Sequence, residues 1–404
     1  MKYLSIAIIA IILTAFFSCD RVEEPTLLNL PLKTQELINS DNAFGLNLFQ
    51  AVLEGEEAEK NVMISPLSIS LALSMTYNGA EGDTKIAMEQ VMEMTGLSLD
   101  EINDLNKQLV DALLAHDPQV ILEIANSIWY RDGFSVKSDF IDRNQTYYDA
   151  VVRAMNFSDP KTIDIINDWV SENTHGKIDE IVDEITADSF MFLINAIYFK
   201  GAWRYEFKDK NTHDALFYLD DKQSVEHPMM TMSIDANMLQ NDLFTALELP
   251  YGKGNWSMFL FLPNWERTLD DVIGLFTAEN WNYWMDDFIE MKDISIQIPR
   301  FKFAYDTSLK DVLKAMGMEI AFAGAADFSG ILDGGQLYIN DVKHKSFIEV
   351  NEEGTEAAAV TSVEINKESA GNFFFANKPF LFAIAEKTSG AILFAGRVMN
   401  PAVE

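Results

Sequence analysis

Histidine, cysteine and serine are the residues whose types and spacing most often reveal a catalytic or metal site. The chain has five histidines, and none belongs to a His-Glu-x-x-His motif or to another pair of ligands one helical turn apart. Its single cysteine excludes a cysteine cluster for zinc. We therefore expect no metal site. The histidines are His116, His175, His213, His227 and His344.

Signals for nucleophiles and phosphate binding are missing as well. There is no Gly-x-Ser-x-Gly motif, P-loop or dinucleotide-binding glycine pattern, and the glycine-rich residues 330–335 are typical of a turn. Carboxylates are so abundant that a pair at catalytic spacing carries no information. His344, between Lys343 and Lys345, is more typical of a structural histidine than of a general base. We expect no catalytic residue, no cofactor and no enzymatic activity.

The composition favours one large acidic domain. Asp and Glu number 63 and Lys and Arg 30, which gives a formal net charge of −33. Such a surface repels phosphate backbones, so nucleic acids and heparin-like polyanions are poor partners. Hydrophobic residues make up 48%, enough for a large core. The length allows two or three domains, but no linker, low-complexity tract or repeat follows residue 40, so we expect a single domain and a monomer.

The N-terminus has the features of an export signal. Met1-Lys2 precedes an apolar run over residues 4–17, and Ser18 and Cys19 follow it. This arrangement resembles the lipobox of bacterial lipoproteins, although Phe16 stands where leucine is usual. We expect a signal peptide over residues 1–18 and a lipid-anchored tether over residues 19–37. A plain cleaved signal and an uncleaved anchor are the alternatives.

Export with a lipid on Cys19 would fix the location and the membrane contact of the protein. We expect it in the cell envelope, on the periplasmic or the cell-surface side, and release to the exterior is the alternative. The lipid would be its only contact with the membrane.

The first half of the chain carries clear helix signals. Residues 39–41 offer N-caps for a helix whose apolar face begins at Phe44. Ser65 and Pro66 suit the cap and first position of a helix that is apolar nearly all round and so belongs in the interior. The motif at residues 98–101 is a capping box that opens an amphipathic helix.

Strand patterns dominate later. Residues 119–130 predict a strand and residues around 163–170 a helix. Residues 190–199 are apolar on both faces, which predicts a central strand in which Asn195 must find polar partners. Helices early and strands late, without regular alternation, predict an α+β fold. Further strands are predicted over residues 256–262, 294–303, 336–339, 347–350, 380–385 and 391–398, with one helix over residues 309–316.

The segment over residues 351–366 is ambiguous. From Thr355 to Ile365, alternate residues are small or β-branched, which is typical of a half-buried strand. Acidic residues before it and polar residues after it are typical of an exposed loop, and Glu356 to Ala359 has high helix propensity. Local rules leave both interpretations open: an exposed loop, or a segment that is a loop in one state and a strand in another.

Six motifs together resemble one family. The stretch Glu352-Glu-Gly-Thr-Glu-Ala-Ala-Ala359 is similar to the hinge of the serpins, serine protease inhibitors that trap their target by inserting a cleaved loop. Five other stretches match the family and stand in its order, so the resemblance covers roughly residues 38–401. These stretches are residues 61–68, 166–178, 195–203, 377–380 and 396–401.

The resemblance implies a fold and a mechanism. The fold would be α+β, with a helical N-terminal half, three β-sheets and a reactive loop over about residues 352–375, in one domain over residues 38–404. A target protease would cleave the loop and form an acyl-enzyme. The loop would then enter the main sheet as a new strand and trap the protease covalently. Targets would be serine-type endopeptidases and, in some cases, cysteine-type endopeptidases.

The resemblance also assigns roles to residues. The hinge would comprise Glu352, Gly354, Thr355, Ala357, Ala358 and Ala359. Ser65, Asn195 and His344 would belong to the shutter beneath the opening of the sheet. Trp203 would lie at the breach, where the loop first enters, close to Glu352. None of these roles is catalytic.

The target depends on the bond that is cleaved. Counting from the hinge places this bond at Glu368-Ser369, which suits a glutamate-specific protease. One residue earlier, Lys367-Glu368 suits a trypsin-like enzyme, and other enzymes would cut around Ile365. The hinge carries small residues, whereas non-inhibitory serpins commonly carry bulky or charged ones. An inhibitor is therefore favoured over the alternative, a non-inhibitory serpin with a chaperone-like or binding role.

The lipid anchor gives a first prediction. Cells that express the wild-type protein should incorporate radioactive palmitate into it, and cells that express Cys19→Ala should not, because the thiol is the only acceptor the chain offers. Labelling is measured on immunoprecipitated protein. Equal labelling of the two proteins would exclude the anchor.

Overall fold

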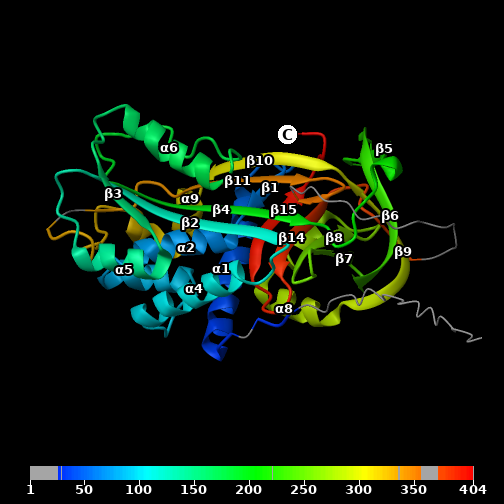
Figure 1. The fold of residues 1–404 in the computed structure, drawn as a ribbon, viewed down its shortest axis with the longest axis horizontal. Coiled ribbons are helices and arrows are strands. Elements are labelled where there is room, and N and C mark those ends of the chain that lie inside the picture. The colour runs from blue at the N-terminus through cyan, green and yellow to red at the C-terminus, as the bar shows by residue number, and fades with distance from the viewer. Residues whose placement is uncertain (1–25, 29, 221, 335–336, 356–371, 404) are drawn as a thin grey trace, which may run out of the picture.

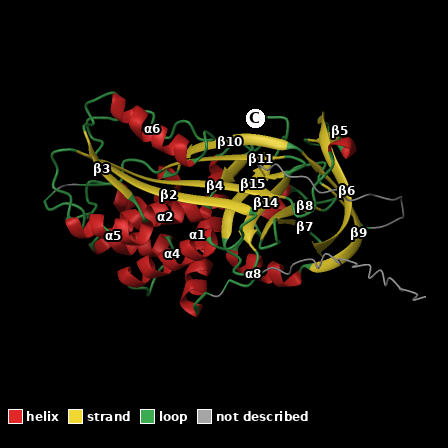
Figure 2. Ribbon diagram, in the orientation of Figure 1, coloured by secondary structure: helices red, strands yellow, loops and turns green. Residues whose placement is uncertain are grey.

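The computed structural model describes residues 26–28, 30–220, 222–334, 337–355 and 372–403. Cys19 and the predicted signal peptide lie outside them. Figures 1 and 2 show an elongated molecule in which a bundle of helices lies against one face of a long sheet, and further strands gather at the opposite end. Among the described residues, no helix is both long and apolar enough to cross a membrane.

Helices occupy mainly the first half of the chain, as predicted. The α-helices are α1 (Leu32–Gly55), α2 (Pro66–Tyr77), α3 (Gly82–Val91), α4 (Leu99–Leu114), α5 (Ser138–Tyr148), α6 (Lys161–Asn173), α7 (Leu269–Ile273), α8 (Ala278–Asp287) and α9 (Lys310–Leu313). Short helical turns of other types are η1 (Asp209–Asn211), η2 (Lys314–Met318) and η3 (Glu319–Phe322).

Strands dominate the second half of the chain, and β1 to β4 precede it. They are β1 (Val62–Ile64), β2 (Val120–Arg131), β3 (Val151–Met155), β4 (Met191–Ala202), β5 (His213–Tyr218), β6 (Ser224–Gln240), β7 (Phe244–Tyr251), β8 (Trp256–Pro263), β9 (Ile289–Pro299), β10 (Phe301–Ser308), β11 (Lys343–Val350), β12 (Gly354–Thr355), β13 (Phe373–Phe375), β14 (Phe380–Glu386) and β15 (Ile392–Val398).

The strands form two hydrogen-bonded sheets. One sheet has six strands in the order β10-β11-β12-β4-β2-β3. The other has nine, in the order β1-β15-β14-β8-β7-β6-β9-β13, and β5 pairs with β6 outside this path. The long strand β6 divides the nine-stranded sheet into a larger and a smaller part. The predicted α+β fold with three sheet regions is thus confirmed.

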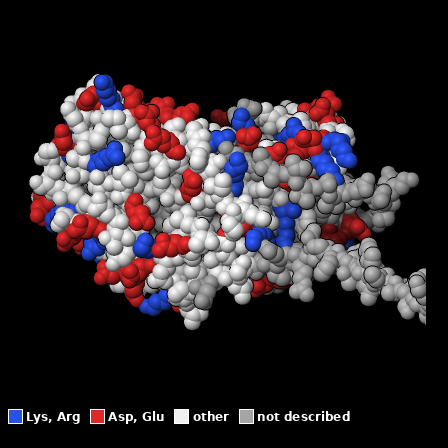
Figure 3. Space-filling view, viewed as in Figure 1, with Lys and Arg blue, Asp and Glu red and all other residues white. Residues whose placement is uncertain are grey.

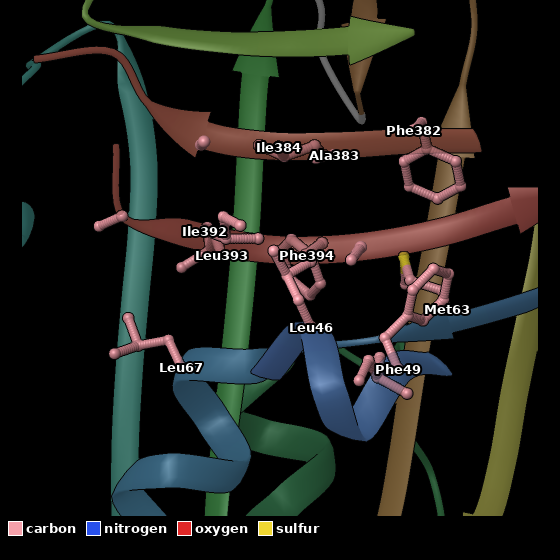
Figure 4. Packing of buried hydrophobic residues seen from close by; sticks show 14 of the residues in the cluster. Leu46, Phe49, Met63, Leu67, Phe382, Ala383, Ile384, Ile392, Leu393 and Phe394 are labelled. Carbon is pink, nitrogen blue, oxygen red and sulfur yellow. The ribbon is translucent and has the colours of Figure 1, made fainter. Parts of the chain in front are cut away.

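The main core lies between helices from the start of the chain and strands from its end. Strands β14 and β15 are buried along their whole length. Figure 4 shows their side chains facing α1, α2 and β1. Helix α2 is buried on nearly every side, as its composition predicts. The labelled contacts come from Leu46, Phe49, Met63, Leu67, Phe382, Ala383, Ile384, Ile392, Leu393 and Phe394.

A second, smaller core holds α6 on the opposite face of the six-stranded sheet. Ile128 on β2 points into the main core and its neighbour Trp129 into the second one, as the alternation of a strand requires. Trp129 packs there with Ile166 and Val170 of α6. Both faces of the sheet are therefore covered in this region.

Two capping predictions are confirmed. The Ser65 side chain accepts a hydrogen bond from the Ser68 amide, and Pro66 is the first residue of α2. Ser98 and Glu101 form the capping box of α4. In both cases the signal is local, so the sequence alone was sufficient to place the helix start.

The predicted start of the first helix is wrong. Helix α1 begins at Leu32, so residues 39–41 lie inside it. Asp41 accepts a hydrogen bond from Ser70 on α2, and Asn42 bonds the backbone of Gly390 and Ile392. These side chains bond to residues that are distant in the sequence, so they do not cap the start of a helix.

Two predicted strands are also wrong. The strand predicted over residues 294–303 is two strands, because the chain leaves one sheet after Pro299 and enters the other at Phe301. Residues 337–339 of the strand predicted over residues 336–339 have no regular structure. Arg300, at the crossing between β9 and β10, is part of the site described below.

Charge is spread widely over the surface. Figure 3 shows acidic side chains distributed over the visible face, with lysines and arginines between them. This agrees with the strong acidic excess of the chain.

The buried carboxyl of Asp41 gives a second prediction. Its Oδ2 has no hydrogen-bond partner, and burial raises its pKa to about 7 against the opposing effect of the Ser70 hydrogen bond. A carboxyl whose pKa is higher in the folded state binds its proton more tightly there. The fold therefore loses stability as pH rises from about 4 to about 7, and the loss persists above that range. Asp41→Asn should remove the loss.

The difference is measured as the urea unfolding midpoint of wild type and Asp41→Asn at about pH 5 and about pH 8. The variant should be more stable at the higher pH, by roughly 4 kcal/mol, and by only about 1–2 kcal/mol at the lower one. Ser70→Ala is the control for the hydrogen bond alone. An Asp41→Asn effect of the same size at both pH values would contradict the assignment.

Candidate functional site

Strands β4 and β11 face each other in the middle of the six-stranded sheet with only a two-residue strand between them. Both are antiparallel to β12, so they run parallel to one another. The strand register pairs Gly354 with Ala202, and Thr355 with both Gly201 and Val350. In the described part of the chain, β4 and β11 have no direct ladder with each other. Below β12, each therefore presents an edge that can accept another strand.

A tight turn connects β11 to β12. The amide of Asn351 donates to the carbonyl of Gly354 at 3.0 Å, and the Gly354 amide donates to the carbonyl of Asn351 at 3.3 Å. Gly354 has a φ of 151°. A Cβ on it would lie 2.1 Å from the carbonyl oxygen of Gly201. Only glycine fits here, because any side chain would push β12 away from β4.

Thr355 points into the protein. Its side chain is buried, and its hydroxyl lies 2.6 Å from the hydroxyl of Tyr251 on β7. By strand alternation, the residues two and four positions later would face the same way. The residues at these positions in the sequence have small side chains.

Trp203 fixes the turn from the opposite strand. Its indole Nε1 donates to the carbonyl of Asn351 and its amide to the carbonyl of Glu353, both at 2.9 Å. Its ring stacks on Tyr251, with centroids 4.5 Å apart. Trp203 therefore lies directly beside the turn that leads into β12.

Glu352 is buried and is held by an ion pair with Arg300, which is partly exposed. Its carboxylate accepts two hydrogen bonds of 2.8 Å from Nε of Arg300 and another from Nη2, and it also accepts from the Thr212 hydroxyl. Burial alone would raise the pKa of Glu352, but the bonds from Arg300 and Thr212 outweigh it and hold that pKa below its usual value. Glu352 therefore stays charged and anchors the turn.

A cavity of about 480 Å³ lies in the gap between β4 and β11. Its walls include Asn195 of β4 and His344 of β11, and α2 contributes Ser68 and Ala72 to its floor. A smaller cavity directly below Thr355 reaches Met63 and Phe394. The open edges of the two strands thus border real space in the protein.

Ser65 and His344 are in contact at the base of this gap. The Ser65 amide donates to Nε2 of His344 at 3.2 Å, and the Ser65 hydroxyl donates to the carbonyl of Leu393 at 2.7 Å. Burial lowers the pKa of His344 to about 4, so the ring is neutral at physiological pH. Its Nε2 can therefore accept the hydrogen bond from the Ser65 amide. This is a structural histidine, as its sequence context predicts.

Asn195 lines the same cavity but has different partners. Its amide donates to Asn126 on β2 at 2.8 Å, while its buried Oδ1 finds no hydrogen-bond partner among the described residues. The structure therefore brings Ser65 and His344 together and leaves Asn195 across the gap with an unused acceptor.

Several predicted site residues lie outside the described residues. They are Ala357, Ala358 and Ala359 of the hinge and Lys367, Glu368 and Ser369 of the predicted cleavage region. Other important residues were missed: Arg300, Thr212 and Tyr251. A lone arginine next to a proline between two apolar runs is the only local signal that Arg300 gives.

The sequence is similar to that of a known protein family and of several known proteins. A family model described as serpin (serine protease inhibitor) matches residues 39–401. Human neuroserpin is 33% identical over 85% of this chain and 87% of its own length. Intracellular coagulation inhibitor 2 of Tachypleus tridentatus is 33% identical over 90% of this chain and 91% of its own.

A solved serpin structure has the same fold as this chain. The crystal structure of the thermophilic serpin tengpin in its native state superimposes with a TM-score of 0.83 and 30% identity, covering 93% of this chain and 96% of that one. The match of the family model over most of the chain, together with these relatives, shows that the protein belongs to the serpin family, whose members are mostly protease inhibitors and not catalysts.

Proposed function

We propose that the protein inhibits serine-type endopeptidases, and in some cases cysteine-type endopeptidases, as a suicide substrate. The observation that carries this proposal is the short strand β12, whose two residues already occupy the entrance of the gap between β4 and β11. The chain that follows Thr355 has the small residues that such a gap accepts. After cleavage, that chain would continue β12 as a full strand.

The register of β12 supports this. Continued in steps of two residues, the buried face would carry Ala357 and then Ala359. Thr361 would come between Asn195 on β4 and His344 on β11. The unused Oδ1 of Asn195 would then face an incoming backbone. The polar residues at the base of the gap would thus serve a sheet in two states.

The covalent step follows from the chemistry of serine proteases. The protease hydroxyl attacks the carbonyl carbon of Glu368, the bond to Ser369 breaks, and the new amine of Ser369 leaves with a proton. The protease remains joined to Glu368 as an ester. Insertion of residues before Glu368 would carry the protease along the sheet before water hydrolyses that ester.

Insertion releases enough energy to drive this motion. Each new ladder hydrogen bond contributes ~0.5–1.5 kcal/mol net. About a dozen residues would then release on the order of 10 kcal/mol, similar to the whole stability of many domains. The uncleaved state is therefore held kinetically. The Arg300–Glu352 pair and Trp203 fix the point from which insertion begins.

The non-inhibitory alternative is less well supported. Such a protein needs no insertable hinge, whereas Gly354 and Thr355 are fitted closely between two strands here. We further propose that the inhibitor is exported and anchored through Cys19 in the cell envelope, which would direct it towards proteases at the cell surface or in the periplasm.

Hinge chemistry gives a third prediction. Thr355→Arg should convert the inhibitor into a substrate, because an unpaired charge does not fit the buried position against Tyr251, so β12 would leave the sheet and insertion would lack its starting strand. The measurement is the amount of SDS-stable complex formed with a panel of glutamate-specific and trypsin-like proteases. Wild type should form the complex, and the variant should be cleaved with at least about tenfold less complex.

Thr355→Ser is the matched control and should inhibit like wild type, since it keeps the hydroxyl. A stable complex with Thr355→Arg would contradict the hinge argument. Wild type that is cleaved without forming a complex and without gaining thermal stability would instead identify a non-inhibitory serpin.

The cleaved bond gives a fourth prediction. Mass spectrometry should find a C-terminal peptide that begins at Ser369 after a glutamate-specific protease and at Glu368 after a trypsin-like one. The sample must be denatured first, because β14 and β15 lie in the core and keep this peptide bound. A different start would overturn the assigned register.

A further inference from the structure

Strand β13 presents two large apolar side chains to solvent. Phe373 is 64% exposed and Phe375 40%, while Phe374 between them is 1% exposed. The two exposed rings lie side by side, with centroids 5.2 Å apart. Their cross-strand neighbours on β9 are the polar residues Ser295 and Gln297. The two phenyl rings thus form a small apolar surface in polar surroundings, which we call the Phe373/Phe375 surface.

Strand β13 is also an edge of its sheet. It pairs only with β9 in the described part of the chain, in parallel orientation over three residues. Phe374 anchors it in the core from below. The backbone of this short strand is therefore fixed, and the position of both exposed rings is fixed with it.

The distance to the predicted cleavage site is short. Phe373 follows Ser369 by four residues, and four extended residues span at most about 14 Å. A protease domain of roughly 230 residues has a radius of gyration of roughly 17 Å. An enzyme that holds the 368–369 bond in its active site must therefore lie over the protein surface around β13.

We propose that the Phe373/Phe375 surface is a second contact site for the target protease, and that it selects enzymes with an apolar patch on the leaving-group side of the cleft. This inference rests on the proposed function. Aromatic side chains contribute strongly to interfaces because they bury much area with little loss of conformational freedom. Polar neighbours would form the rim of such a contact.

Chain connectivity decides when this contact acts. The ester would join the protease to Glu368, on the part of the loop that inserts. Phe373 and Phe375 stay on the other side of the cleaved bond, on β13, and are followed by the core strands β14 and β15. Protease that moves with Glu368 must therefore leave the Phe373/Phe375 surface. The contact accelerates the encounter and adds nothing to the final complex.

This separation makes the inference testable. The double variant Phe373→Ser/Phe375→Ser is compared with wild type, using the protease of the panel that forms the covalent complex fastest. We expect the second-order rate constant of inhibition to fall about tenfold. The lifetime of the complex and the number of inhibitor molecules consumed per protease should stay the same.

Three controls sharpen the result. Tyr283→Ser removes another aromatic residue, 67% exposed on α8, and should leave the rate unchanged. Phe373→Leu/Phe375→Leu keeps apolar area and should recover most of the rate. A free peptide of residues 361–371, which lacks both phenylalanines, should be cleaved at a rate that does not depend on this surface and gives the reference for the bond itself.

The outcomes separate the two proposals. Covalent complexes that form at the same rate with wild type and the double serine variant would overturn this inference and leave the inhibitor function intact. A shorter lifetime of the complex in the variant would also overturn it, because it would place the contact in the final state. Absence of any covalent complex with wild type would overturn both.

Discussion

Two facing strand edges, those of β4 and β11, set the constraint on which the rest of the structure depends. Backbone N–H and C=O groups inside a protein require partners, and along most of this gap the described chain supplies none from a neighbouring strand. The turn at Asn351, the Arg300–Glu352 pair and the Ser65–His344 contact hold the ends of the gap. The buried helix α2 supplies its floor. A fold that leaves its main sheet unfinished in this way stores the energy of the missing ladder.

Local chemistry explains which elements the sequence could predict. The Ser65-Pro66 cap and the Ser98–Glu101 capping box act within one helical turn, so their signals are complete in the sequence. The start of α1 could not be predicted, because Asp41 looks like a cap until its distant partner on α2 is known. Strand β6 escaped notice because its mixed polar pattern becomes half-buried only through sheet pairing, and β5 because it is mostly exposed.

The site was predictable only in part for the same reason. Family motifs indicated a hinge and a shutter, and the structure shows Gly354 and Thr355 as a short strand between β11 and β4. Arg300, Tyr251 and Thr212 are 52, 104 and 140 residues away from their hinge partners along the chain. In a chain with 63 acidic residues, nothing in the sequence marks Glu352 as the one that an arginine will hold.

The position of β15 has a consequence for how the protein is made. This strand lies between β14 and β1, so residues 395–397 pair with residues 62–64 near the beginning of the fold. A strand from late in the serpin domain is thus needed to join the sheet to one of its earliest strands. Folding of the domain cannot finish before residues 395–397 are synthesised, and the earlier helices must wait for them without their central packing partner. The export proposed above would benefit from this delay, because a translocation channel accepts a loosely folded precursor.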